Sequence, residues 1–163
     1  MLVSVVIPTY NRLPILQQCL RALEAQLPLD PGDDFEVVLV DDGSTDGTVE
    51  WIQQEAAELP HVRLICQEHG GPAIGRNLGV DHAGGEVIIF IDSDLVVVPD
   101  FLQHHLRSLR QAWQRDGDRL CFTYGAVINT HNFESPESEP HKLSDLSWAY
   151  FATGNVAIDK TVL

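Results

Sequence analysis

Basic residues are scarce in this sequence. Its 163 residues include 24 Asp and Glu but only 10 Lys and Arg, which gives a formal net charge of −14. This acid excess argues against nucleic acid or an anionic membrane surface as the main partner, because both are negatively charged. It also creates a problem for any phosphate-containing ligand, whose charge would have to be neutralised by a divalent cation or by backbone N–H groups.

Cysteine and long apolar runs are also lacking. The three cysteines, Cys19, Cys66 and Cys121, are far apart and have no zinc-ligand spacing, which predicts buried, reduced thiols in a cytoplasmic protein. The longest apolar stretch, residues 87–98, is interrupted by Asp92 and Asp94 and is too short to cross a membrane. Neither a GxGxxG fingerprint nor a Walker A loop is present, so a dinucleotide oxidoreductase ranks low.

What the sequence does contain is an alternation of strand and helix patterns. Largely apolar runs predict strands at residues 2–7, 35–40, 62–66, 87–91 and 120–128. Helical spacing predicts helices at 14–23, 48–59, 73–83 and 99–113. Residues 129–147, rich in Ser, Pro, Glu and His, predict a long mobile loop, and ordered structure is expected again from 148 to 158. The alternation predicts one α/β domain over residues 1–163 with a mainly parallel sheet.

Unusual polar residues cluster at the carboxyl ends of three predicted strands. They are Thr9, Tyr10 and Asn11 after the first strand, Asp41 and Asp42 after the second, and Asp92, Ser93 and Asp94 after the fourth. Ligands of parallel α/β sheets bind at this edge. Acids that merely solvated loops would be scattered over both ends of the sheet, so this clustering predicts a binding site.

Asp92 and Asp94 are two positions apart on a segment that we take as extended, so their side chains are expected to point the same way. Converging carboxylates repel one another unless they share a cation, and hard oxygen ligands suit Mg²⁺ or Mn²⁺. The alternative is that these residues cap a loop or the next helix. Taken alone, an Asp-x-Asp pattern favours that alternative.

Asp41 and Asp42 are a second acidic pair. Nucleotide-binding α/β domains use an acidic residue at this position to contact a ribose or base, although an Asp-Gly turn would look the same. The run from Asp42 imitates a calcium loop, but its twelfth position is Gln53 and an apolar strand precedes it, which excludes an EF-hand. Arg76, after the glycine pair at 70–71, could reach a phosphate or fix a loop.

Together, five stretches resemble family 2 glycosyltransferases of the GT-A fold. In order they are SVVIPTYNR at residues 4–12, VLVDDGSTDGT at 38–48, GPAIGRNLG and GGE within 71–86, FIDSD at 90–94 and TGN at 153–155. Each motif is common alone, whereas five in order make chance an unsatisfactory explanation. The resemblance implies a three-layer α/β/α sandwich and an inverting transferase that uses a nucleotide-diphosphate sugar, most commonly a uridine donor.

The resemblance also implies a site. It assigns donor binding to Pro8, Thr9, Tyr10, Asn11, Asp41, Asp42, Arg76, Asp92 and Ser93, and a divalent metal, Mn²⁺ or Mg²⁺, to Asp94 and Asp92. Family members normally continue beyond the TGN stretch, where a Glu-Asp pair often carries the catalytic base. Nothing after Lys160 can supply that base, and Asp159 stands in the wrong relation to the motif. We therefore expect the donor-binding part of a longer enzyme, with the acceptor part and any membrane attachment beyond it.

Two other functional classes stay open at this stage. A nucleotide-sugar-binding or assembly module would share donor and metal but lack turnover, and apolar surface around residues 148–163 would favour a homo-oligomer. A nucleotidyltransferase would need a glycine-rich basic loop after the first strand, where only Asn11-Arg12 stands. The acceptor, a sugar or a lipid, cannot be named from the sequence.

Overall fold

The computed structural model describes residues 1–127 and 154–163. Its strands are β1 (Leu2–Thr9), β2 (Asp34–Asp41), β3 (Val62–Cys66), β4 (Val87–Ile91), β5 (Phe122–Tyr124) and β6 (Asn155–Asp159). Its helices are α1 (Leu13–Glu24), α2 (Thr48–Gln54), α3 (Pro72–His82) and α4 (Phe101–Asp116), and a short 3₁₀ turn spans Lys160–Val162. The six strands form one sheet in the order β3-β2-β1-β4-β6-β5.

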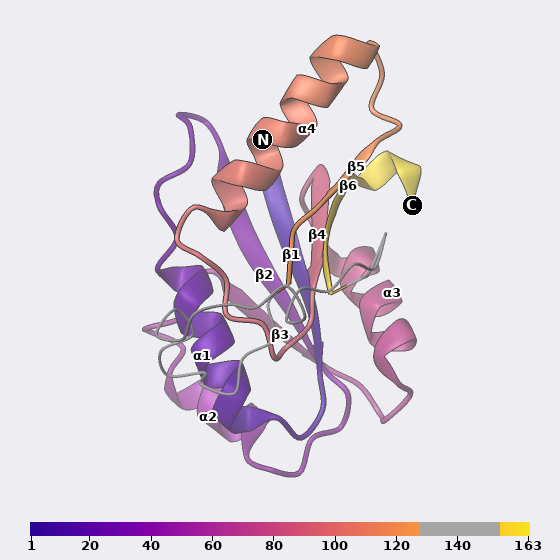
Figure 1. Ribbon diagram of the computed structural model, residues 1–163. Coiled ribbons are helices and arrows are strands. Elements are labelled where there is room, and N and C mark those ends of the chain that lie inside the picture. Colours follow the sequence, from indigo (N-terminus) through magenta and orange to yellow (C-terminus); the bar gives the residue numbers. More distant parts are fainter. Residues whose placement is uncertain (128–153) are drawn as a thin grey trace.

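The sheet is mainly parallel and lies between two helical layers, as the sequence predicts. Strand β1 pairs in parallel with β2 and β4, and β2 pairs in parallel with β3, whereas β6 runs antiparallel to both β4 and β5. Apolar side chains of α1, α2 and α4 pack on one face of the sheet. Helix α3 lies on the other face (Figure 1), where Leu78 and Val80 pack against the sheet. The three-layer α/β/α prediction is thereby confirmed.

Two glycines let α3 lie directly on β1. A Cβ atom added at Gly79 would come within 2.4 Å of Val6 Cγ1, and one added at Gly75 within 3.2 Å of Pro8 Cβ. A larger residue at either position would therefore push the helix away from the sheet. Arg76 follows Gly75, so this close packing sets how near its guanidinium comes to the carboxyl ends of the strands.

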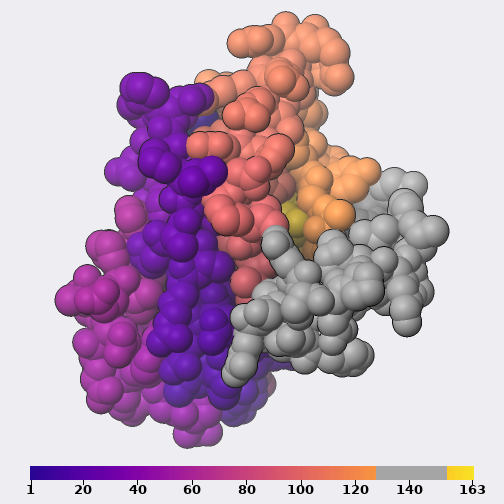
Figure 2. Space-filling view, turned by 60° about the vertical axis from the view of Figure 1, so that its left-hand side comes forward, coloured from indigo at the N-terminus to yellow at the C-terminus, as the bar shows by residue number. Residues whose placement is uncertain are grey.

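The opposite helical layer is joined by polar contacts as well as by its core. Gln26, just after α1, donates from Nε2 to the carbonyl oxygen of Val98 at 2.8 Å and accepts at Oε1 from the Leu102 amide at 3.0 Å. These bonds fix the start of α4 beside the end of α1. The indigo-to-violet segment and the pink-to-orange segment that contains α4 lie side by side in Figure 2.

Some predicted boundaries are wrong. Helix α2 ends at Gln54, and turns replace the helix expected to reach residue 59. Strand β5 ends at Tyr124, because Gly125 packs against Asn155 and no longer pairs as a strand. Of the three free cysteines only Cys19 is buried, while Cys66 is exposed, which contradicts the expectation of buried thiols.

The predicted loop at 129–147 and the first part of the ordered stretch expected from 148 lie outside the described residues. Within the described ranges, every helix is too short or too polar to span a membrane.

Candidate functional site

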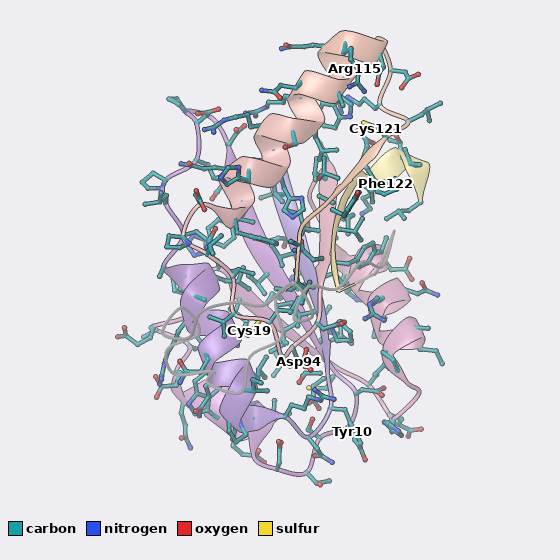
Figure 3. All side chains as sticks on the ribbon, viewed as in Figure 1. Tyr10, Cys19, Asp94, Arg115, Cys121 and Phe122 are labelled. Carbon is teal, nitrogen blue, oxygen red and sulfur yellow. The ribbon has the colours of Figure 1, made fainter. Side chains whose placement is uncertain are left out.

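A cavity of about 410 Å³ lies at the carboxyl ends of β1, β2 and β4. Its lining residues are Pro8, Thr9, Tyr10, Arg12, Asp42, His69, Pro72, Arg76, Asp92, Ser93 and Asp94. The cavity thus gathers all of the predicted site residues except Asn11 and Asp41. Figure 3 shows Tyr10 and Asp94 at this end of the sheet, far from Arg115 and Cys121 at the other end.

Asp42 is the most firmly held acid of the cavity. Its buried carboxylate accepts hydrogen bonds from Gln67 Nε2 at 2.5 Å and from the Gly70 and Gly71 amides at 2.8 Å each. Burial alone would raise the pKa of Asp42, but these three donors, assisted by His69, outweigh burial and hold the pKa below its usual value. Asp42 is therefore ionised at neutral pH.

His69 and Tyr10 form a stacked pair at the cavity. Their ring centroids are 4.1 Å apart and the rings are inclined by 27°. The Nδ1 atom of His69 lies 2.8 Å from Asp42 Oδ2, which ties the imidazole to the buried acid. Both rings are partly exposed, so this pair offers a flat apolar surface of the kind on which nucleobases stack.

Asp92 and Asp94 lie in a turn rather than on an extended segment. The Leu95 amide donates to the Asp92 carbonyl oxygen at 3.2 Å, which closes the turn directly after β4. Asp92 then forms an ion pair with Arg76 of α3, whereas Asp94 forms one with Arg12, just before α1. The expectation that both carboxylates point the same way from an extended strand is wrong, although both still line one cavity.

Asn11 and Asp41 lie outside the cavity lining and organise the loops beneath it. Asn11 has a φ of 49°, in the left-handed region. Its side-chain Oδ1 accepts from the Thr45 backbone amide at 2.7 Å, and its backbone N–H donates to Ser44 Oγ at 2.9 Å. Buried Asp41 accepts from the Ser44 amide at 3.0 Å. These contacts join the loop after β1 to the loop after β2, so the two residues shape the site without facing the cavity.

Two buried polar atoms of lining residues have no hydrogen-bond partner among the described residues. They are Thr9 Oγ1 and Arg76 Nε. Buried polar groups are nearly always hydrogen-bonded, because an unsatisfied one costs about 1–3 kcal/mol. Because both atoms are buried, a ligand in the cavity could reach them only if the surrounding side chains moved.

The sequence reasoning missed three lining residues: Arg12, His69 and Pro72. Arg12 lies in the first motif, where the sequence indicates only a single cation. Nothing in the sequence pairs it with Asp94, which is 82 positions away. For His69 a signal existed, because it directly precedes Gly70-Gly71, the glycine pair whose amides bind Asp42.

The oxygen ligands in the cavity suit a hard divalent ion. Asp92 and Asp94 keep 45% and 37% of their side-chain surface exposed, so their carboxylates remain accessible. No group of three or more His, Cys, Asp or Glu side chains in the part of the chain that the structure describes could hold an ion by itself. Magnesium-type ions often take only one or two protein carboxylates and complete their shell with water and substrate phosphates, and these residues fit that pattern.

The chain is similar to known proteins in sequence. Residues 4–142 match the family described as Glycosyl transferase family 2. The glycosyltransferase GlyG of Streptococcus pneumoniae is 33% identical over 154 residues, which cover 94% of this chain and 44% of GlyG.

Two solved structures are also similar. The crystal structure of S. aureus TarS 1–349 in complex with UDP-GlcNAc has a TM-score of 0.60 at 32% identity, covering 68% of this chain and 32% of that one. The mannosyltransferase PcManGT from Pyrobaculum calidifontis, in complex with GDP-Man and Mn²⁺, has a TM-score of 0.65 at 28% identity, covering 96% and 44%. The chain therefore spans less than half the length of each of these three proteins.

Proposed function

Because the chain belongs to glycosyltransferase family 2, we propose that its cavity binds a nucleotide-diphosphate sugar together with Mn²⁺ or Mg²⁺ for transfer of the sugar with inversion. One observation carries this proposal: Asp42, Asp92 and Asp94 from two different strand ends line the same hollow as the aromatic surface of Tyr10. The similar structures that hold UDP-GlcNAc, or GDP-Man with Mn²⁺, support the same class of ligand.

Different residues of the cavity would contact different parts of the nucleotide. The ring of Tyr10 would stack on the base, and Asp42, ionised and fixed by its three donors, would accept from a base N–H or a ribose hydroxyl. The guanidinium of Arg76, a residue that lines the cavity, would donate to an acceptor oxygen of the ligand. We favour uridine as the base because the resemblance to family 2 glycosyltransferases most commonly implies a uridine donor, and one similar structure holds UDP-GlcNAc.

Asp94 and Asp92 would hold the metal. A divalent ion bound there would neutralise charge on the diphosphate, both in the bound donor and as the leaving group departs. The chain's own contribution is to keep two carboxylates at the rim and to bring Arg12 and Arg76 beside them. Because these arginines are already paired with acids, they leave little free positive charge for a diphosphate.

Inversion requires a base that takes the proton of the acceptor hydroxyl. In a direct displacement, the acceptor oxygen bonds to the anomeric carbon, the bond to the diphosphate breaks with its electron pair, and a carboxylate takes the hydroxyl proton. Asp159 cannot play this part, because it is 1% exposed, binds Thr161 and Arg119, and pairs with Val87 at the opposite end of β4. The acceptor and its base therefore remain unassigned.

A module that binds the nucleotide sugar without turnover is the second candidate. It is favoured by the role of Asp159, the last residue of β6, whose carboxylate binds Arg119 and Thr161 and so helps to build the fold. Release of sugar from UDP- or GDP-sugars with Mn²⁺, either to water or to added acceptors, would separate an enzyme from a binding module.

The donor site is tested by calorimetric titration of UDP and GDP in the presence of Mn²⁺. We expect Asp94→Asn to weaken the Mn²⁺-dependent affinity for the bound nucleotide by about 10- to 100-fold, while the melting temperature stays unchanged. Asp42→Ala should weaken nucleotide binding even without metal, because it removes a contact to the nucleoside.

A matched control is Asp81→Asn, which removes one carboxylate from an exposed position on α3. It should leave both affinities unchanged. Equal affinities in wild type and Asp94→Asn at every Mn²⁺ concentration would refute the metal assignment. A loss in Asp42→Ala that appears only when metal is present would move Asp42 from the nucleoside to the metal.

A further inference from the structure

His105 connects three elements near the rim of the sheet. Although it lies on α4, its ring is only 6% exposed. Its Nδ1 atom lies 2.7 Å from Thr123 Oγ1 of β5, and its Nε2 atom lies 2.9 Å from Asn155 Oδ1 of β6. An amide oxygen can only accept, so Nε2 carries the proton and donates to Asn155, while Nδ1 accepts from the Thr123 hydroxyl.

Asn155 is half-buried and is contacted from both β4 and α4. It pairs with Ile91, the residue directly before Asp92. Its carbonyl oxygen accepts from the Gly125 amide at 3.2 Å, and a Cβ atom at Gly125 would lie 2.3 Å from Asn155 Nδ2. The side chain of Asn155 therefore packs closely against Gly125, and its amide oxygen is held by the bond from His105.

The preceding residue, Gly154, lies against the candidate metal ligand. A Cβ atom at Gly154 would come within 2.8 Å of Asp92 Oδ2. Only glycine fits there unless the carboxylate moves. The backbone at Gly154 thus limits the positions that the Asp92 carboxylate can adopt, and that backbone is in turn held by Asn155.

We propose that His105 is a positioning residue of the donor site, which fixes Asn155 and thereby holds Gly154 against the carboxylate of Asp92. The role rests on the proposed function, because Asp92 matters only if the cavity binds a nucleotide. His105 touches neither the cavity nor its lining; it acts through two neighbouring residues. Residues that orient ligands from outside a metal site typically change its affinity by 10- to 100-fold when they are replaced.

The test compares two replacements of the same residue. His105→Leu fills a similar volume but makes neither hydrogen bond, so we expect the affinity for UDP with Mn²⁺ to fall by about 10-fold. His105→Gln can still donate to Asn155 and accept from Thr123, so it should restore most of that affinity. The neighbouring variant His104→Gln changes an exposed ring that contacts Asp100, and it should bind like wild type.

A general loss of stability is controlled by Leu109→Ala, which removes a fully buried side chain on the same helix without touching Asn155. It should lower the melting temperature and leave UDP affinity unchanged. If it weakens binding as much as His105→Leu, or if His105→Leu binds like wild type, the positioning role is refuted and the donor site stands. If wild type binds neither UDP nor GDP with Mn²⁺, the proposed function and this role fall together.

Discussion

The imidazole of His105 shows how burial can decide the protonation state of a single residue. Burial lowers its pKa most, the bond to Asn155 opposes that change, and the neighbouring His104 adds to the lowering. The net pKa therefore lies below the usual value near 6.5. The ring is neutral at pH 7, which is the form in which Nδ1 can accept from Thr123.

This lowered pKa predicts a pH dependence of folding stability. The unfolded chain binds a proton near pH 6.5, whereas the folded chain binds it only at lower pH. The stability associated with His105 is therefore fully present above pH 6.5 and is lost as the pH falls toward the folded pKa. Between pH 7.5 and 5.5, wild type should therefore lose more unfolding free energy than His105→Gln.

Urea denaturation at both pH values measures this difference. His82→Gln serves as the control because its exposed ring lies on α3, across the sheet from His105, and it should keep the wild-type dependence on pH. If wild type and His105→Gln lose the same stability on acidification, the buried ring does not resist protonation.

At the residue scale, position along the chain predicted most of the cavity lining. Asp42, Asp92 and Asp94 could be found because each follows an apolar strand whose carboxyl end must lie at the ligand-binding edge. Their partners could not be found. Arg12 reaches Asp94 across 82 positions, and Arg76 reaches Asp92 across 16, through turns whose path the local sequence does not determine.

Among the secondary-structure elements, α3 is the one most sensitive to side-chain size. Gly79 faces Val6 so closely that an added Cβ atom would overlap it at 2.4 Å. Gly79→Ala should gain up to about 1 kcal/mol of helix propensity but lose more through overpacking, for a net decrease of about 1–2 kcal/mol in unfolding free energy. Displacement of α3 should also carry Arg76 away from Asp92 and weaken UDP binding.

Chemical denaturation and UDP titration measure these two effects. Asp81→Ala, an exposed substitution on the same helix, should change neither. If the Gly79→Ala protein is more stable than wild type, α3 can move away from the sheet without lowering the free energy of unfolding, and the close packing at Gly79 is not required.

The elements themselves were predicted unevenly. Strands β3 and β4 match their predicted bounds because turn-forming residues flank each run on both sides. Helix α2 was predicted too long because buried Leu59 continues an apolar spacing, although residues 55–59 fold as turns. The insertion of antiparallel β6 between β4 and β5 could not be predicted, since it depends on pairing between segments more than 60 positions apart.

For the whole molecule, the dominant property is its negative charge. A net charge of −14 repels a nucleotide diphosphate at long range. At short range, Arg12 and Arg76 are already paired with the two acids of the Asp-x-Asp turn. Arginine thus supplies only part of the positive charge that the proposed diphosphate would need, and we expect a cation to supply the rest.

This charge balance predicts a metal requirement that depends on the phosphates of the ligand. Removal of divalent ions with EDTA should reduce the affinity for UDP by about 10-fold or more, because the ion no longer offsets repulsion between diphosphate and carboxylates. Uridine, which has no phosphate, should bind equally well with EDTA and with Mn²⁺, since we propose that its contacts are with Tyr10 and Asp42. Parallel titrations of both ligands check this. If UDP binds equally well in EDTA, the two arginines alone hold the diphosphate and no metal is needed; if uridine also loses affinity, the ion supports the nucleoside part of the cavity instead.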